Sequence, residues 1–191
     1  MRKGDDLFFA PGVRFSELAL EDGRFVNQLR QRVVGFYLQP ARLCIDNGHA
    51  FAAGVLLVST IDFLAGLHHS AEELPYRKVG LDFMAFVRET LKSFSPPDLA
   101  RQLYEDFRNG LTHEARVKNA GEFSFDHQQT ACVAGGRLCI NPQFLLGEVE
   151  KALDSYVKKL AEDTVLRDAV AKRTRALFSA ELGLVDSAQA G

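Results

Sequence analysis

Apolar residues recur every three or four positions in several stretches of the chain, which is the pattern of amphipathic helices. The first stretch starts near residue 25 and carries polar residues on its opposite side. Its apolar positions are Phe25, Val26, Leu29, Val33, Phe36 and Tyr37. Pro40 predicts the end of this helix, because proline lacks an amide hydrogen and clashes with the preceding turn.

A second stretch, residues 49–67, is apolar nearly all round, which is typical of a helix enclosed by its neighbours. It also contains the only candidate membrane span, residues 50–67. Asp62 lies within that span, and a charged side chain in the bilayer core is costly. We therefore expect a buried central helix and no membrane, with an arginine or tyrosine of a neighbouring helix as the partner of Asp62.

Four further helices are predicted from periodicity and from start and stop signals. Their expected ranges are 79–91, 97 to about 107 or beyond, 142 to about 160, and 164 to about 182. The segments "EFSFD", "TACVA" and "RLCIN" read instead as short strands around Gly135-Gly136, a two-residue hairpin loop.

These elements predict a mainly α fold, an antiparallel up-and-down bundle of five to six helices. A small β-hairpin insertion at about residues 122–140 would separate the fourth helix from the last two. At 191 residues the chain suits one domain, residues 25–182, preceded by an N-terminal arm over 1–24 and followed by a flexible tail over 183–191.

The formal net charge of -2 and the pI near 6.2 are not those of a protein that coats nucleic acid, because phosphate binding depends on Lys and Arg. Any contact with RNA must therefore be local. The content of 47% hydrophobic and 25% charged residues is that of an ordinary globular protein.

Three cysteines, Cys44, Cys132 and Cys139, are expected to be free thiols in a reducing cytoplasm, since no signal peptide is recognisable at the N-terminus. A Gly135-Gly136 loop would place Cys132 opposite Cys139 at a hydrogen-bonded pair, which is wider than a disulfide prefers. We expect no metal site and no cofactor, because paired zinc-ligand spacings are missing from the sequence.

Arg108, Asn109 and His113 form the most distinctive chemical pattern. On an unbroken helix Asn109 and His113 share a face, whereas Arg108 and His113 differ by about 140°. Gly110 would also allow the helix to break. A guanidinium can hold a phosphate and an imidazole can transfer a proton, so the pattern suits metal-free RNA cleavage. The alternative is an ordinary helix end, where Arg108 and Asn109 satisfy terminal carbonyls.

The segment "FRNGLTHEAR" resembles the R-N-x-x-x-H signature of the HEPN superfamily (higher eukaryotes and prokaryotes nucleotide-binding domains). The helices from about Phe25 to Leu182 are similar to that family's bundle. The resemblance implies a metal-independent endoribonuclease of toxin–antitoxin or phage-defence systems, acting as a homodimer with Arg108 and His113 catalytic and Asn109 accessory.

Two other functions stay open. One is a non-catalytic HEPN-like binding module that pairs with another chain, such as an antitoxin or a nucleotidyltransferase. The other is a structural helical scaffold. Near the motif, Glu114 is a candidate to orient His113, and three cations are candidates to extend a substrate-binding patch. These cations are Arg101, Arg116 and Lys118.

Overall fold

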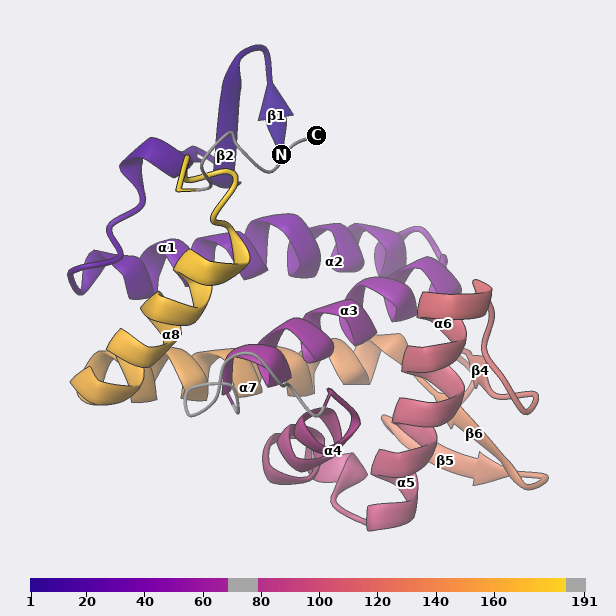
Figure 1. Ribbon diagram of the computed structural model, residues 1–191. Coiled ribbons are helices and arrows are strands. Elements are labelled where there is room, and N and C mark those ends of the chain that lie inside the picture. The colour runs from indigo at the N-terminus through magenta and orange to yellow at the C-terminus, as the bar shows by residue number, and fades with distance from the viewer. Residues whose placement is uncertain (69–78, 185–191) are drawn as a thin grey trace.

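The computed structural model describes residues 1–68 and 79–184 and is mainly helical, with two small three-stranded sheets (Figure 1). The helical elements in chain order are η1 (Phe15–Glu17), α1 (Arg24–Val33), η2 (Val34–Leu38), α2 (Gln39–Asp46), α3 (Ala50–His68), α4 (Val79–Thr90), η3 (Lys92–Phe94), α5 (Pro97–Gln102), η4 (Leu103–Arg108), α6 (Asn109–Glu114), α7 (Pro142–Glu162) and α8 (Thr164–Leu177). The strands are β1 (Arg2–Lys3), β2 (Asp6–Ala10), β3 (Val13–Arg14), β4 (Glu122–Phe123), β5 (Ala131–Ala134) and β6 (Arg137–Ile140). A helical fold with a small β insertion after the fourth predicted helix is confirmed.

The N-terminal segment packs onto the fold through Phe9 and Phe15, whereas residues 1–5 are exposed. β1, β2 and β3 form an antiparallel sheet in chain order. The rings of Phe9 and Phe15 are buried and meet edge to face, and both also contact Phe178, just after α8. The segment predicted as an arm is thus fastened to the C-terminal helix by aromatic contacts.

The prediction that Pro40 ends the first helix is wrong. The helical run continues from α1 through η2 and α2 to Asp46, and Pro40 lies in the first turn of α2. η2 is a π-helical turn in which the Gln39 amide donates to the Val34 carbonyl, five residues back. This wider turn relieves the clash that a proline ring makes with a regular preceding turn.

α3 is the centre of the structure and contacts α2, α4, α7 and α8 (Figure 1). Its range matches the predicted central helix. Its length and composition would suffice to cross a membrane, but 56% of the residues in its most apolar window are buried inside the fold. The neighbouring helices therefore cover much of the apolar surface of α3, as expected for a helix that is apolar on all sides.

The predicted starts of α5, α7 and α8 are confirmed, and α4 is helical from Val79, the first described residue after residues 69–78. The Asn141 side chain accepts a hydrogen bond from the Gln143 amide at 2.9 Å, which caps α7 as expected. α8 ends at Leu177 rather than near Leu182, and the chain continues in turns to residue 184. Most of the predicted tail, residues 185–191, lies outside the described residues.

The second sheet has the strand order β4-β6-β5 and lies beside the end of α6 (Figure 1). β5 and β6 form the predicted hairpin, with Gly135 at φ 58° and Gly136 at φ 78°. Positive φ at both loop positions is the geometry of a type I′ turn. β4 pairs in parallel with β6, so the predicted hairpin is one half of a larger insertion.

Candidate functional site

The helix that carries the candidate motif is unbroken from Pro97 to Glu114, although its winding changes. η4 is a π-helical turn that ends at Arg108, and the Asn109 amide donates to the Tyr104 carbonyl five residues back. Such turns within α-helices are often found at functional sites. Gly110 lies within α6 and does not break the helix.

Arg108 is held on the core side of this helix. Its Nη2 donates to a carboxylate oxygen of Asp62 on α3 at 3.1 Å, and its Nη1 donates to the amide oxygen of Asn109 at 3.1 Å. The side chains of Arg108 and Asp62 are only 15% and 25% exposed. The guanidinium also lies 5.8 Å from the ring centre of Tyr104. An arginine of a neighbouring helix is therefore a partner of Asp62, as expected.

His113 lies at the solvent-exposed end of α6. Within residues 1–68 and 79–184 its imidazole forms no hydrogen bond or ion pair. Asn109 stands four positions earlier in the same regular helix and therefore on the same side as His113. The Arg108 side chain leaves the helix on a different face. Its hydrogen bond to Asn109 therefore links Arg108 to the helix face that carries His113.

Gly110 allows the segment after the helix to fold back onto it. Ala115 ends α6 in the left-handed region at φ 54°, and the Arg116 amide donates to the Gly110 carbonyl at 3.3 Å. A Cβ on Gly110 would lie within 3.0 Å of the Arg116 carbonyl oxygen. The Lys118 amide then donates to the Asp106 carbonyl at 2.9 Å. The glycine of the motif thus serves a close backbone approach.

The predicted cationic patch is largely neutralised by carboxylates. Glu114 pairs with Arg116 and with Lys118, each at 2.6 Å, and not with His113, so it orients the cations rather than the imidazole. The hydrogen bond from Lys118, with help from Arg116, holds the pKa of Glu114 below its usual range. Arg101 pairs with Asp98 at 3.3 Å along its own helix and lies apart from this cluster in the sequence.

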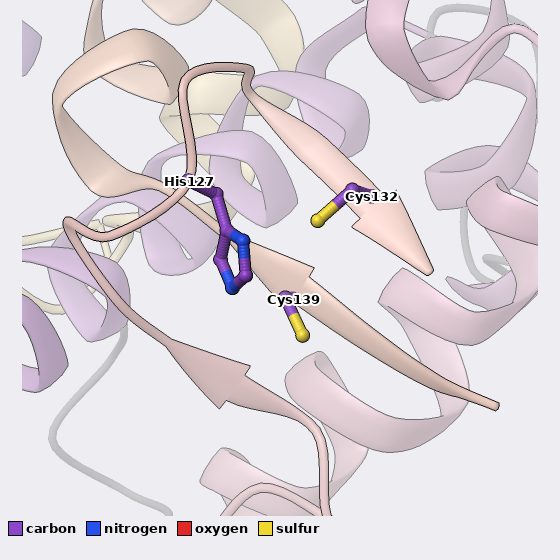
Figure 2. A group of neighbouring side chains, drawn as sticks. All are labelled: His127, Cys132 and Cys139. Atoms are coloured by element: carbon purple, nitrogen blue, oxygen red, sulfur yellow. The ribbon is translucent and has the colours of Figure 1, made fainter. Parts of the chain in front are cut away.

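A second group of reactive side chains lies in the insertion. A ring nitrogen of His127 and the Sγ atoms of Cys132 and Cys139 are all within 4.8 Å of one another (Figure 2). The hairpin loop predicted that Cys132 faces Cys139, and the pairing of the two residues confirms this. The sequence shows no group of metal-binding residues around His127, but the loop from β4 to β5 brings it over the sheet. The sequence also places three residues of metal-binding types close together, namely His69, Glu72 and Glu73. These residues lie outside the described part of the structure.

Glu122 belongs to the same neighbourhood. Its Oε1 lies 3.4 Å from Nε2 of His127, and its backbone is paired with that of Cys139. Hydrogen bonds from Cys139 and then from His127 keep the pKa of Glu122 below its usual range. Burial and the nearby Glu122 raise the pKa of the Cys139 thiol. Glu122, His127, Cys132 and Cys139 are therefore close enough to influence one another's protonation.

Comparison of the sequence with models of protein families finds no match, and neither curated proteins nor solved structures yield one. The resemblance to the HEPN superfamily therefore depends on the motif and on the residues around it.

Proposed function

We propose that the protein is a HEPN-like, metal-independent endoribonuclease whose site combines Arg108, Asn109 and His113. The observation that carries the proposal is the hydrogen bond from Arg108 to Asn109, which stands one helical turn before the exposed His113. The proposal includes an antiparallel up-and-down arrangement of the helices and a homodimer, as the resemblance implies. Single-stranded or loop RNA is the expected substrate, since its bases are open to a shallow groove.

In this mechanism His113 moves the proton and Arg108 meets the phosphate charge. The RNA 2′-hydroxyl attacks the adjacent phosphorus, loses its proton, and the 5′-oxygen leaves with a proton. The products are a 2′,3′-cyclic phosphate and a 5′-hydroxyl end. An exposed imidazole can reach either oxygen, and a guanidinium stabilises negative charge on the phosphate oxygens.

A second copy of the chain would supply a second imidazole. One histidine cannot easily act as base on one side of an in-line displacement and as acid on the other. A two-fold dimer that joins two copies of His113 provides both groups. The position of His113 at the exposed end of α6 suits such pairing.

Asp62 orients the Arg108 guanidinium that would bind the RNA phosphate. A guanidinium has five N–H donors, of which one binds Asp62 and another binds Asn109. Of the remaining donors, Nε is buried and has no partner within residues 1–68 and 79–184, so a phosphate oxygen would meet the guanidinium through the 15% of the side chain that is exposed. Asp62 thus fixes the orientation of Arg108 before substrate arrives, which lowers the ordering cost of binding.

One observation favours a second candidate function, the non-catalytic module that pairs with an antitoxin or a nucleotidyltransferase. Asp62 already offsets the charge of Arg108, and Glu114 offsets part of the charge of Arg116 and Lys118. A surface of balanced charge suits a protein partner better than a polyanion.

Cleavage of end-labelled RNA in the presence of EDTA tests the proposal. We expect wild-type protein to give cyclic-phosphate ends, and His113→Ala and Arg108→Ala to lower the rate by about 10²–10⁴-fold. His49→Ala is a matched control, because His49 is also exposed. A folded wild-type protein that leaves a broad RNA panel intact would exclude the nuclease and favour the binding module.

A mixing experiment tests the shared site. Wild-type protein is exchanged with increasing amounts of the His113→Ala variant at constant total concentration. If both imidazoles are needed, activity falls with the square of the wild-type fraction. A linear fall would show that each protomer cleaves alone and would contradict the dimeric site.

A further inference from the structure

The sheet of the insertion aligns three potential metal ligands in one row. Glu122 pairs with Cys139 across β4 and β6, and Cys139 pairs with Cys132 across β6 and β5. Side chains at directly paired positions lie on the same face of a sheet. His127 reaches this face from the loop between β4 and β5, as Figure 2 shows for its approach to the two thiols.

The loop that carries His127 is fixed by backbone contacts. The side-chain Nδ2 of the buried Asn141 donates to the His127 carbonyl at 2.7 Å. The backbone N–H of Asn141 donates to the Thr130 carbonyl at 3.0 Å. The loop is thereby joined to the start of α7, whose cap is the same Asn141. These bonds fix the backbone that carries the imidazole, so the fold sets the position of His127 beside the thiols.

We propose that His127, Cys132 and Cys139 bind one Zn²⁺ ion, with Glu122 as its fourth ligand. Two thiolates and an imidazole form a soft donor set, which favours zinc over magnesium or calcium. Tetrahedral zinc with Zn–S bonds near 2.3 Å places two sulfur ligands about 3.8 Å apart. The observed spread of 4.8 Å is close enough for small side-chain rotations to close the site.

Glu122 lies outside the group of atoms within 4.8 Å of one another, so its carboxylate would have to turn toward the ion to become the fourth ligand. Its Oε1 lies 3.4 Å from Nε2 of His127, which is long for a hydrogen bond. Two ligands of one tetrahedral zinc ion, a nitrogen and an oxygen at about 2.0–2.1 Å from the metal, stand about 3.3 Å apart. The Glu122 side chain is 42% exposed, so the ion would enter from this side.

A metal ion fits the cysteine pair better than a disulfide does. Cys132 and Cys139 are free and face each other across a hydrogen-bonded pair of antiparallel strands. Cβ atoms of directly opposite residues are about 4.5–5.5 Å apart, with hydrogen-bonded pairs at the wide end, whereas a disulfide needs about 3.5–4.5 Å. An ion between the two sulfurs bridges the wider gap without drawing the strands together.

Binding proceeds by exchange of protons for the ion. Each thiol loses its proton to solvent as its sulfur bonds to zinc, so two protons leave per ion and no oxidation occurs.

The proposed ion would stiffen the insertion against the motif helix. Phe123, next to Glu122, packs edge to face on Phe107 at 5.0 Å, and Phe107 precedes Arg108. The inference goes beyond the proposed nuclease and does not depend on it. Its test therefore measures metal binding and not RNA cleavage.

The full chain, treated with EDTA and a phosphine reductant and then dialysed, is titrated with Co²⁺ and next with Zn²⁺. We expect one equivalent of Co²⁺ to give the visible absorption of tetrahedral cobalt and a near-ultraviolet thiolate band. Binding of Co²⁺ should release two protons per ion, and Zn²⁺ should then displace the Co²⁺ with no further release of protons. Absence of this absorption would overturn the proposal, as would a Cys132–Cys139 disulfide that persists after the phosphine treatment.

Variants assign the ligands. Cys132→Ser and His127→Ala should each weaken Co²⁺ binding at least 10-fold, and Glu122→Gln should weaken it about 10–100-fold. Cys44→Ser and His49→Ala are the matched controls and should bind as the wild type does. Circular dichroism verifies that each variant folds. Cobalt binding that Cys132→Ser and His127→Ala leave unchanged would place the ion elsewhere and refute the site.

Discussion

The carboxylate of Asp62 on α3 accepts a hydrogen bond at 3.1 Å from Nη2 of Arg108, at the junction of η4 and α6. This pair joins the buried central helix to the helix that carries the candidate motif. Because both side chains are mostly buried, removing one partner is expected to destabilise the protein and to release the orientation of Arg108.

Arg108→Ala should lower the free energy of unfolding by about 1–3 kcal/mol, because it removes the guanidinium from a mostly buried carboxylate. Asp62→Asn should cost less, since it keeps an acceptor of similar volume. Urea unfolding of both single variants and the double variant would give the coupling between the two residues.

The surface pair of Arg30 and Asp154 provides the control, because its bond is also 3.1 Å long but its side chains are 48% and 63% exposed. Arg30→Ala should change stability by no more than about 1 kcal/mol. Equal losses for Arg30→Ala and Arg108→Ala would contradict a structural role for the buried pair.

Gly54→Ala should destabilise the protein by about 1–3 kcal/mol, because α3 and β4 meet there without room for a methyl group. A Cβ on Gly54 would lie within 3.0 Å of the Phe123 ring. Gly147→Ala is the matched change in α7, where a Cβ meets nothing within 4 Å. It should stabilise the helix by about 0.5–1 kcal/mol. Thermal unfolding would compare the two variants, and shifts of the same sign would refute the close contact.

The sequence predicts these helices better than it predicts their contacts. The hairpin register follows from Gly135-Gly136 and the cap of α7 from Asn141, because both are local signals. Whether the helix continues past Pro40 depends on whether the preceding turn can widen into a π-helical turn, and the periodicity of apolar residues does not show this. The partner of Asp62 could be predicted only in kind, since its identity depends on how two helices meet.

The candidate sites show the same division. The order of Arg108, Asn109 and His113 fixes which of them share a helix face, and the structure keeps that relationship. The meeting of His127 with the cysteines depends instead on the loop path set by Asn141, a contact between distant residues. The hairpin spacing could have flagged the cysteine pair as a metal candidate, but not its histidine.

Tyr156→Phe should reduce the loss of stability at high pH. Burial of the phenol raises the pKa of Tyr156 well above its ordinary value. Its folded-state pKa then exceeds its unfolded one, so its contribution is full below about pH 10 and is lost as the pH rises further. Urea unfolding between pH 8 and 11 should show a smaller decline for the variant than for the wild type.

At neutral pH the same variant should be neutral or up to about 1 kcal/mol more stable, because within the described residues the buried hydroxyl has no hydrogen-bond partner. If the stability of the wild type and of Tyr156→Phe fell in parallel between pH 8 and 11, burial would not raise the pKa of the phenol.

Ala115→Gly should stabilise the protein by up to about 1 kcal/mol, because an alanine in the left-handed region is strained and a glycine is not. Ala115 has φ 54° at the end of the motif helix. Ala52→Gly, at an exposed position of α3, is the control and should cost about 0.5–1 kcal/mol. Chemical denaturation would measure both, and a loss in Ala115→Gly would show that no strain is stored there.

The aromatic contact that joins Phe9 and Phe15 to Phe178 imposes an order on biosynthesis. A ribosome delivers the first two rings long before the third, so the contact between the N-terminal sheet and Phe178 can form only after more than 160 residues have been added behind Phe15. The strands of the N-terminal sheet can pair with one another before that point, but their packing against the C-terminal helix comes late.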